Sequence, residues 1–314
     1  MRPLLQVQIV TYNSEAAIGS CLDTLLAQSF LPERIVIIDN DSTDQTKSII
    51  ATYIPFFQAQ HVDCEIIPIN TNTGYAAGHN RGIQSAISHH IDLLCTLNPD
   101  IKLDVDYLKY TVSDFRLDEK IGGVTGKLIR SSSDEEAEGI IDSTGLQMEA
   151  FFHARDRGQD EKDRGQYNEP AYVWGVCGAA ALYRVKMLAA LAYQGQYFDE
   201  NFFVYKEDVD LCWRGQSQDW KFYYEPRAFA FHGRGWKKGE RVSPLAQTHS
   251  FANQIALLIK HVPKVSFLLL LSLLVELIRL FVITLRSPEV AKAIIFAIRS
   301  KWAIAWEWRR GMWR

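Results

Sequence analysis

The sequence predicts an α/β fold in which helices cover both faces of a mostly parallel central sheet. Four short apolar runs, QVQIV, RIVIIDN, CEIIPIN and DLLCTLNPD, alternate with segments of helical apolar spacing. Apolar side chains at nearly every position are typical of parallel strands that are buried on both faces. The chain has 314 residues, 47 % hydrophobic and 23 % charged, enough for a large globular domain with an appendage.

Each predicted helix follows one of these strands. The first spans residues 14–29, where apolar side chains recur at helical spacing. The second begins at the cap residues 42–44 and ends near residue 53, and the third spans about residues 77–89 after a turn that contains glycine. A doubly covered parallel sheet binds its ligands beyond the carboxyl ends of its strands.

Polar residues gather at those carboxyl ends. They lie at residues 11–13, at Asp39-Asn40, at residues 70–74 and at residues 98–100. Turn chemistry alone explains a single such strand end, because Asn, Asp and Gly are common turn residues. Four polar ends on one edge of the sheet predict a binding site.

Residues 131–170 interrupt the alternation of strands and helices. SSSDEEAEG and RDRGQDEKDRGQYNEP are charged and loop-like, with a short apolar piece, residues 146–152, between them. The segment is either a solvated insertion or a lid over the active site, and the sequence does not separate the two.

Two side chains are candidate metal ligands. Asp100 ends the fourth strand in the turn NPD, where a carboxylate facing a cleft can hold a divalent cation that bridges two phosphates. His232 follows the strand-like run FYYEPRAFAF and precedes Gly-Arg-Gly. A lone histidine is more often structural, but an imidazole at this strand end could complete the coordination of a metal held by Asp100.

A cluster of carboxylates marks a second candidate site. Glu207, Asp208 and Asp210 stand where a helix is predicted to begin. The helix dipole alone favours acidic residues in a first turn. The functional alternative is a general base that accepts a proton from an attacking hydroxyl. Nearby, Gly178 and two alanines either admit a ligand to the backbone or only pack tightly.

The motifs together resemble the family-2 glycosyltransferases of the GT-A fold, and most closely the rhamnosyltransferase-like members that build bacterial cell-surface polysaccharides. The resemblance covers about residues 7–235 and rests on seven motifs in family order: VQIVTYNS, IIDNDSTD, NTGYAAGHNRG, LNPD, WGVCGAAALYR, FDENFFVYKEDVDLCWRG and FHGRG. It implies an inverting, metal-dependent transfer of a sugar, with L-rhamnose from dTDP-rhamnose as the favoured donor. Galactofuranose and N-acetylglucosamine donors remain open.

The same resemblance implies a role for each matching residue. Asp208 would be the catalytic base with Glu207 in reserve, and Asp100 and His232 would bind the divalent cation, Mg²⁺ or Mn²⁺. Asn98 stands where the family's DxD-like motif has its first Asp. Tyr12 would lie near the base, and Asp39 would accept a hydrogen bond from a pyrimidine. The expected nucleotide-sugar-binding set is Thr11, Tyr12, Asn13, Asp39, Asn72, Gly74, Gly78, Asn80, Asn98 and Gly178.

The last sixty residues differ from the rest in charge. Residues 255–314 hold ten Lys/Arg and three Glu, which gives this segment a net charge of +7. Because the whole chain has a net charge of −3, the remaining residues carry −10. The split favours an anionic surface as the partner of the tail and argues against a nucleic-acid-binding body. VSFLLLLSLLVELIRLFVITL is long enough to span a membrane, but Glu276 and Arg279 lie near its centre.

A second tail segment mixes Trp with Lys and Arg, which is typical of a helix in the headgroup region. We therefore expect a catalytic domain at 1–245, with a nucleotide half at about 1–105 and an acceptor-side half at about 106–245. A helical membrane-associating tail would occupy 246–314. A helix packed on the domain, an oligomer contact and a true span remain alternatives. The resemblance implies a polyprenyl-diphosphate-linked glycan acceptor.

Five scattered cysteines without a CxxC motif predict reduced thiols in a cytosolic compartment. No signal peptide is recognised at the start of the chain. The expected location is therefore the cytoplasmic face of the plasma membrane, by peripheral attachment. A nucleotidyltransferase of related fold would carry a Gly-rich loop in place of TYNSEAAIGS. A catalytically inactive glycan-binding scaffold would not need Asp100, Asp208 and His232 together.

Overall fold

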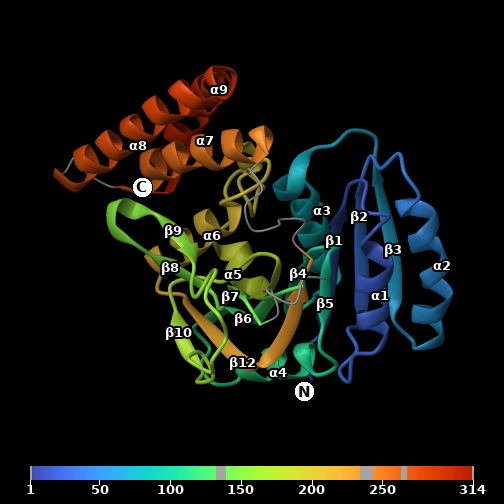
Figure 1. The fold of residues 1–314 in the computed structure, drawn as a ribbon. Coiled ribbons are helices and arrows are strands. Elements are labelled where there is room, and N and C mark those ends of the chain that lie inside the picture. Colours follow the sequence, from blue (N-terminus) through green and yellow to red (C-terminus); the bar gives the residue numbers. More distant parts are fainter. Residues whose placement is uncertain (1, 132–138, 234–242, 263–266, 313–314) are drawn as a thin grey trace.

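The computed structural model describes residues 2–131, 139–233, 243–262 and 267–312. One large sheet runs through it in the order β10-β12-β6-β11-β4-β1-β2-β3 (Figure 1). Strands β1 (Leu5–Thr11), β2 (Arg34–Asn40), β3 (Asp63–Ile69) and β4 (Leu93–Leu97) are parallel. Strands β1, β2 and β4 are buried as their apolar sequences predict, whereas β3, at the edge of the sheet, is only partly buried. Helices α1 (Ile18–Leu26), α2 (Thr46–Ala59) and α3 (Gly74–Ser88) connect them, which confirms the predicted fold class.

The two faces of β1 show how the layers are held. Leu5, Val7 and Ile9 point into the core cluster that also contains residues of α1 and α2. The alternate residues Gln6 and Gln8 are fully buried against α3, where their amides donate to the Gly82 carbonyl at 2.9 Å and contact His79 Nδ1 at 2.7 Å. The strand is thus fixed in register on one face by apolar packing and on the other by buried hydrogen bonds.

The second half of the chain extends the same sheet. It contains β5 (Ile101–Leu103), α4 (Tyr107–Asp114), β6 (Ile121–Arg130), β11 (Ala180–Arg184), α5 (Val185–Ala190), α6 (Glu207–Ser217) and β12 (Lys221–His232). Strand β11 lies antiparallel between β4 and β6, and β12 runs parallel to β6. The carboxyl ends of β1, β2, β4, β6 and β12 therefore share one edge.

The prediction for residues 131–170 is corrected where the structure describes them. Residues 139–173 form β7 (Ile141–Ser143), β8 (Leu146–Met148), the short 3₁₀ helix η2 (Ala150–Phe152), β9 (Ala154–Asp156) and β10 (Ala171–Val173). Strand β7 pairs with β6, β10 pairs with β12, and β8 and β9 form a hairpin of their own. The short strands of the segment belong to the folded body, whereas residues 157–170 contain no helix or strand and are mostly exposed, in keeping with their loop-like sequence. Residues 132–138 lie outside the described ranges.

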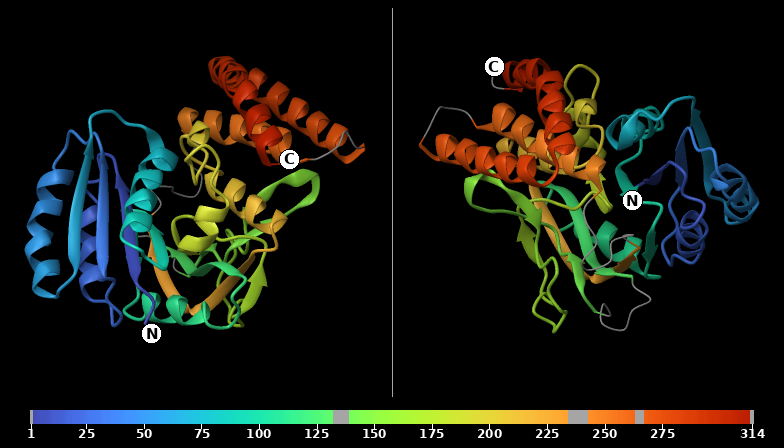
Figure 2. Two further views of the ribbon diagram at one scale, coloured as in Figure 1. Left: turned by 180° about the vertical axis from the view of Figure 1, so that it is seen from behind. Right: turned by 45° about the horizontal axis from the view of Figure 1, so that its top comes forward.

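Helical packing continues across the predicted domain boundary at 245/246. Helix α7 (Pro244–His261) is buried from Phe251 to His261 in the same core cluster as α5 and α6. Helices α8 (Phe267–Arg286) and α9 (Pro288–Met312) follow it. All three stack at one end of the molecule, away from α1 and α2, in each of the three views (Figures 1 and 2). Helix α7 is therefore part of the folded body, and α9 packs on it with Ile294 and Ala305 in the same cluster, while α8 is the most exposed of the three.

Candidate active site

The ends of β1 and β2 form a buried floor under one exposed aromatic ring. Thr11 Oγ1 donates a hydrogen bond to Asp39 Oδ1 at 3.1 Å, and the Ser42 N–H donates to Asp39 Oδ2, also at 3.1 Å. Thr11 and Asp39 are 0 % and 1 % exposed, whereas Tyr12 is 50 % exposed. The structure thus brings Thr11, Tyr12 and Asp39 together. Tyr12 presents an exposed aromatic face, whereas Thr11 is buried below it and is not accessible to a ligand.

Asn13 ties the two strand ends to each other. Its backbone N–H donates to Ser42 Oγ, and its side-chain Oδ1 accepts from the Thr43 N–H, both at 2.9 Å. The residue has a φ of 49°, a left-handed conformation that asparagine tolerates better than most residues. Polar residues at the end of β1 therefore have a structural role, because Asn13 links this strand end to the loop that follows β2.

The next predicted stretch, residues 72–80, contains one exposed candidate residue, Asn72, and three buried ones, Gly74, Gly78 and Asn80. Asn72 is exposed, and its Oδ1 accepts from the Gly74 N–H at 2.9 Å. Gly74 has a φ of +85° and lies so close to Phe203 that a Cβ would come within 2.5 Å of its ring. A Cβ on Gly78 would come within 2.9 Å of Val10. Gly78 is therefore a packing residue and not a nucleotide contact as expected.

Asn80 requires the same correction. It is 2 % exposed, and its side-chain oxygen accepts from the Phe198 and Tyr197 N–H groups while its amide donates to the Phe198 carbonyl and to Glu200 Oε1. These four bonds use the hydrogen-bonding capacity of the amide. Asn80 holds the loop that leads to α6, and its amide has no donor left for a nucleotide.

Asp100 and His232 meet at the shared carboxyl edge, as predicted. His232 Nε2 lies 3.4 Å from Asp100 Oδ1, and His232 Nδ1 lies 2.7 Å from Asp142 Oδ2. Although burial lowers the pKa of His232, its hydrogen bonds to Asp100 and Asp142 outweigh this and raise the pKa to about 9. Asp142, which is 0 % exposed, is a site residue that the sequence did not reveal.

This arrangement fits a divalent cation. With Nδ1 bonded to Asp142, Nε2 of His232 points to Asp100, which is how a second carboxylate orients a metal-binding histidine. Within the described ranges, no three His, Cys, Asp or Glu side chains form a metal-binding group, so Asp100 and His232 would supply two ligands. Mg²⁺ and Mn²⁺ in phosphate sites commonly take remaining ligands from the phosphates. Arg234 and Gly235 of the FHGRG motif lie outside the described residues.

The carboxylate of Asp208 is linked to the same edge through Gly178. The Gly178 N–H donates to Asp208 Oδ2 at 3.0 Å, and the Gly178 carbonyl accepts from Tyr75 Oη and Thr96 Oγ1, both at 2.8 Å. The Asn98 N–H, three residues before β5 begins, donates to the Ala179 carbonyl at 2.8 Å. Gly178 thus positions the candidate base beside residues 98–100, and a Cβ there would press on Tyr75 Oη at 3.2 Å.

The two carboxyl groups of the acidic pair have different surroundings. Glu207 is 6 % exposed, and its Oε2 has no hydrogen-bond partner among the described residues. Burial and the neighbouring Asp208 raise the pKa of Glu207 well above its usual range. Burial also raises the pKa of Asp208, but the N–H groups of Gly178 and Val209 oppose this by stabilising its anion. Glu207 therefore keeps its proton more readily, and Asp208 is the better base.

A strained loop precedes this pair. Phe203, Tyr205 and Lys206 all have φ values between 64° and 69°, conformations that L-residues other than Asn and Asp rarely adopt. Asn253 of α7 holds the loop: its amide contacts the carbonyl oxygens of Phe202, Val204 and Tyr205 at 3.0, 2.9 and 2.7 Å. Such strain persists only where surrounding structure imposes it, and α7 does so here.

Helix α7 also carries a buried charge network under α6. Lys260 Nζ lies 2.7 Å from both Asp199 Oδ2 and Asp210 Oδ1, and His261 Nε2 lies 2.8 Å from Asp210 Oδ1. Arg214 Nε contacts Asp210 Oδ2 at 3.0 Å. Burial alone would raise the pKa of Asp210, but Lys260 and Arg214 hold it below its usual range. Of the predicted acidic cluster, Asp210 is therefore held in ion pairs with Lys260, Arg214 and His261, and Asp208 is not part of that network.

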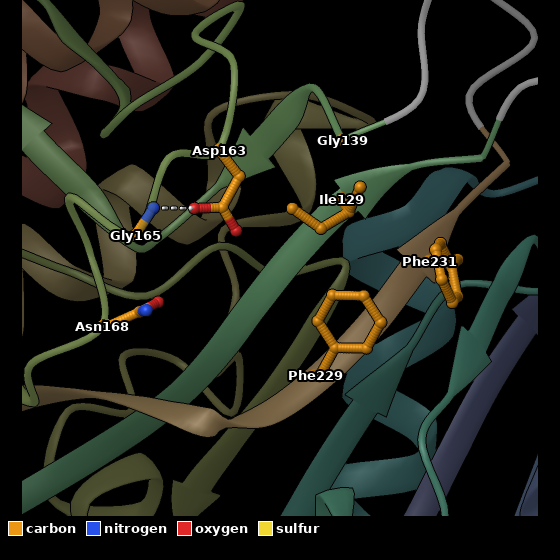
Figure 3. A pocket seen from close by; sticks show the side chains of 7 residues that line it. All are labelled: Ile129, Gly139, Asp163, Gly165, Asn168, Phe229 and Phe231. Carbon is orange, nitrogen blue, oxygen red and sulfur yellow. Dashed lines mark hydrogen bonds between the residues drawn. The ribbon is translucent and has the colours of Figure 1, made fainter. Parts of the chain in front are cut away.

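A separate hollow lies on the other face of β12. It has a volume of about 440 Å³ and is floored by Phe229 and Phe231, whose rings are 4.8 Å apart, with Asp163 and Asn168 at its side (Figure 3). Phe229 and Phe231 alternate along the strand with the buried Ala230 and His232. The hollow therefore opens away from His232, and we do not assign the donor to it.

Comparison with known proteins identifies the fold and the family. Residues 6–191, more than half of the chain, match the model of glycosyl transferase family 2. The chain belongs to this family. A family relative is the poly-β-1,6-N-acetyl-D-glucosamine synthase of Staphylococcus epidermidis, 26 % identical over 224 residues, which are 71 % of this chain and 48 % of the relative. The enzyme of the same name from Staphylococcus aureus strain COL is 29 % identical over 118 residues, 38 % of this chain and 27 % of its own.

This family-2 glycosyltransferase thus spans about half the length of the curated relatives it matches. Among solved structures, the mannosyltransferase PcManGT of Pyrobaculum calidifontis, in complex with GDP-Man and Mn²⁺, aligns with a TM-score of 0.58, covering 96 % of this chain and 76 % of its own at 16 % identity. GalNAc-T7 with UDP, GalNAc and Mn²⁺ aligns with a TM-score of 0.55, covering 82 % and 48 % at 14 % identity. These similarities show the GT-A fold.

Proposed function

We propose that this chain transfers a sugar from a nucleoside-diphosphate donor to a hydroxyl group of a cell-envelope glycan acceptor, with inversion at the anomeric carbon. The observation that carries the proposal is the convergence of the Asp39 floor, the Asp100–His232 pair and the Asp208 carboxylate on one sheet edge. A nucleotide pocket and a general base are then next to each other, as a direct displacement requires.

The residues of the chain divide the work. Tyr12 offers a flat exposed surface to the base, and the buried Asp39 stabilises the loop beneath it. A divalent cation on Asp100 and His232 would offset the negative charge that builds up on the leaving diphosphate. Asp208 accepts the proton of the acceptor hydroxyl as its oxygen attacks the anomeric carbon, while Gly178 fixes the orientation of the carboxylate.

For the donor we propose UDP-N-acetylglucosamine ahead of dTDP-rhamnose. The named relatives are poly-β-1,6-N-acetyl-D-glucosamine synthases, and S. aureus TarS, whose fold aligns with a TM-score of 0.53, was solved with UDP-GlcNAc. The preference for rhamnose rests on overall sequence likeness and on no residue that contacts the sugar. We further propose a lipid-linked acceptor at the cytoplasmic face of the plasma membrane, since the basic helices α8 and α9 adjoin the catalytic body.

A thermal-shift panel tests this proposal on the purified full chain. A donor present at about 100 times its Kd stabilises the folded state by about 2.7 kcal/mol, a rise of several degrees in Tm. We expect UDP-N-acetylglucosamine with Mn²⁺ to give the largest rise, dTDP-rhamnose a smaller one, and Asp100→Asn to lose the Mn²⁺-dependent part. Glu169→Gln, an exposed control, should behave as the parent. No shift with any nucleotide sugar or nucleoside diphosphate would refute the proposal.

A further inference from the structure

Helix α8 exposes a continuous apolar face. Its mean hydropathy reaches 2.5, and it is long and apolar enough to cross a membrane. Phe267 and Leu285, near its two ends, are 78 % and 70 % exposed, and Leu277 and Phe281 between them are both 63 % exposed. Monomeric soluble proteins rarely leave an apolar patch of this extent in water, so the face requires an occupant.

The inner side of the same helix is fixed to the catalytic body by a buried carboxylate. Glu276, at the middle of α8, is 2 % exposed, and its Oε1 lies 2.6 Å from His153 Nε2 and 3.0 Å from Arg279 Nη1. Ser272, one turn earlier, is also buried. His153 directly follows η2, where the Phe152 carbonyl accepts from Gln254 of α7 at 2.9 Å.

These contacts argue against a transmembrane orientation of α8. A spanning helix would carry Glu276 and Arg279 to the centre of the hydrocarbon, where charged groups are strongly disfavoured. It would also have to take His153, and with it the β8–β9 hairpin, away from the sheet or into the lipid. A helix lying along the surface keeps the Glu276–His153 contact against the protein and leaves Arg279, whose side chain is 46 % exposed, paired with Glu276.

Helix α9, which packs against α8, also exposes large apolar side chains. Phe296, Trp302 and Trp306 are 76 %, 50 % and 41 % exposed. The opposite side of α9 is buried, and α8 and α9 lie side by side at the end of the molecule (Figures 1 and 2). Exposed cations at Arg286, Lys292, Arg299 and Arg310 outnumber the exposed Glu289 and Glu307. Tryptophan with Arg and Lys beside an apolar stripe is typical of helices in the headgroup layer.

We propose that α8 and α9 form a monotopic docking face that lies in the plane of a bilayer with anionic headgroups. The outer side chains of α8 enter the boundary between headgroups and acyl chains, and the cations of α9 contact lipid phosphates. In-plane attachment specifies how the protein would bind the membrane proposed above. It rests on the proposed function only through the lipid-linked acceptor. A second copy of the chain is a poorer occupant, because a two-fold contact would place like charges of the same face opposite one another.

Vesicle flotation tests the occupant. The full chain is mixed with phosphatidylcholine vesicles with or without about one third phosphatidylglycerol, and the floated fraction is measured. We expect binding to the anionic vesicles and at least about a tenfold loss of partitioning for Leu277→Glu/Phe281→Glu. Phe56→Glu, which changes an equally exposed (60 %) apolar residue on α2, should float as the parent. Equal flotation of the double variant, or a parent dimer that the variant abolishes without any vesicle binding, would overturn the proposal.

Cysteine labelling tests the in-plane orientation. In inverted membrane vesicles from cells that make the full chain, Ser287→Cys, between α8 and α9, should react with an impermeant maleimide before detergent is added. Protection until detergent is added would show that α8 spans and would overturn the proposal. The nucleotide thermal shift of the same variants stays at the parent value if only the membrane inference fails, so the two failures are distinguishable.

Discussion

The proposed nucleotide edge and the proposed catalytic pair of this glycosyltransferase are built in opposite ways. At the nucleotide edge, Thr11, Asn13, Asp39 and Ser42 bond to one another across two adjacent parallel strands, within about thirty residues of sequence. Glu207 and Asp208 instead stand on a helix held from α7, by Lys260 and His261 on Asp210 and by Asn253 on the preceding loop. The first site is a local motif, and the second depends on contacts made across some fifty residues.

The comparison predicts its largest effect at Lys260, which is 0 % exposed between Asp199 and Asp210. Lys260→Met leaves two buried carboxylates without their shared cation, and we expect a loss of about 3–5 kcal/mol in the free energy of unfolding, measured in urea. The control Lys292→Met removes a surface pair and should change stability by less than about 1 kcal/mol. Equal stability of the two variants would show that α7 does not support α6.

A smaller effect is expected at Asp142, the orienting partner of His232. Asp142→Asn keeps the shape but weakens the hold on Nδ1, so the concentration of Mn²⁺ that gives half-maximal activity should rise about 10–100-fold. Asp118→Asn, at an exposed pair with Lys221, serves as the control. An unchanged Mn²⁺ requirement, with donor binding intact, would remove Asp142 from the site.

At the nucleotide edge the effects should be smaller still. Tyr12→Ala removes the exposed ring and should weaken the binding of the nucleoside diphosphate by roughly tenfold, read by calorimetry, because stacking of a base on an aromatic ring contributes about 1–3 kcal/mol. Tyr12→Phe keeps the ring and should bind as the parent. If both variants bind equally well, Tyr12 does not contact the base.

The smallest predicted change is a shift in the pH profile. The positive charge of Lys206 lowers the pKa of Asp208 against the effect of burial. Removing it in Lys206→Met should raise that pKa, so the loss of kcat/KM on the acid side should begin at a higher pH than in the parent. The sign follows because the base must be deprotonated to act, and a higher pKa retains its proton to higher pH. A shift to lower pH would contradict the assignment of Asp208.

These contrasts explain what could be read from the sequence. The fold class, the polar strand ends and the Glu207–Asp208 pair were predicted because each rests on a local pattern of strand, turn or helix start. The pairing of Asp100 with His232 was predicted because each ends a strand and both match motifs of the family. Asp142 was missed because only the pairing of β7 with β6 brings it to His232. The roles of Gly78, Asn80 and α7 were misjudged because their partners lie in distant segments, which the sequence alone does not identify.

The role of Asp208 is the central claim, and transfer of a labelled sugar tests it most directly. Radiolabelled UDP-N-acetylglucosamine and dTDP-rhamnose are incubated with membranes that contain the full chain, Asp208→Asn or Glu207→Gln, in Mn²⁺. We expect transfer by the parent, a loss of about 10²–10⁴-fold in kcat for Asp208→Asn with donor binding retained, and a smaller loss for Glu207→Gln. Near-normal transfer by Asp208→Asn would contradict the account.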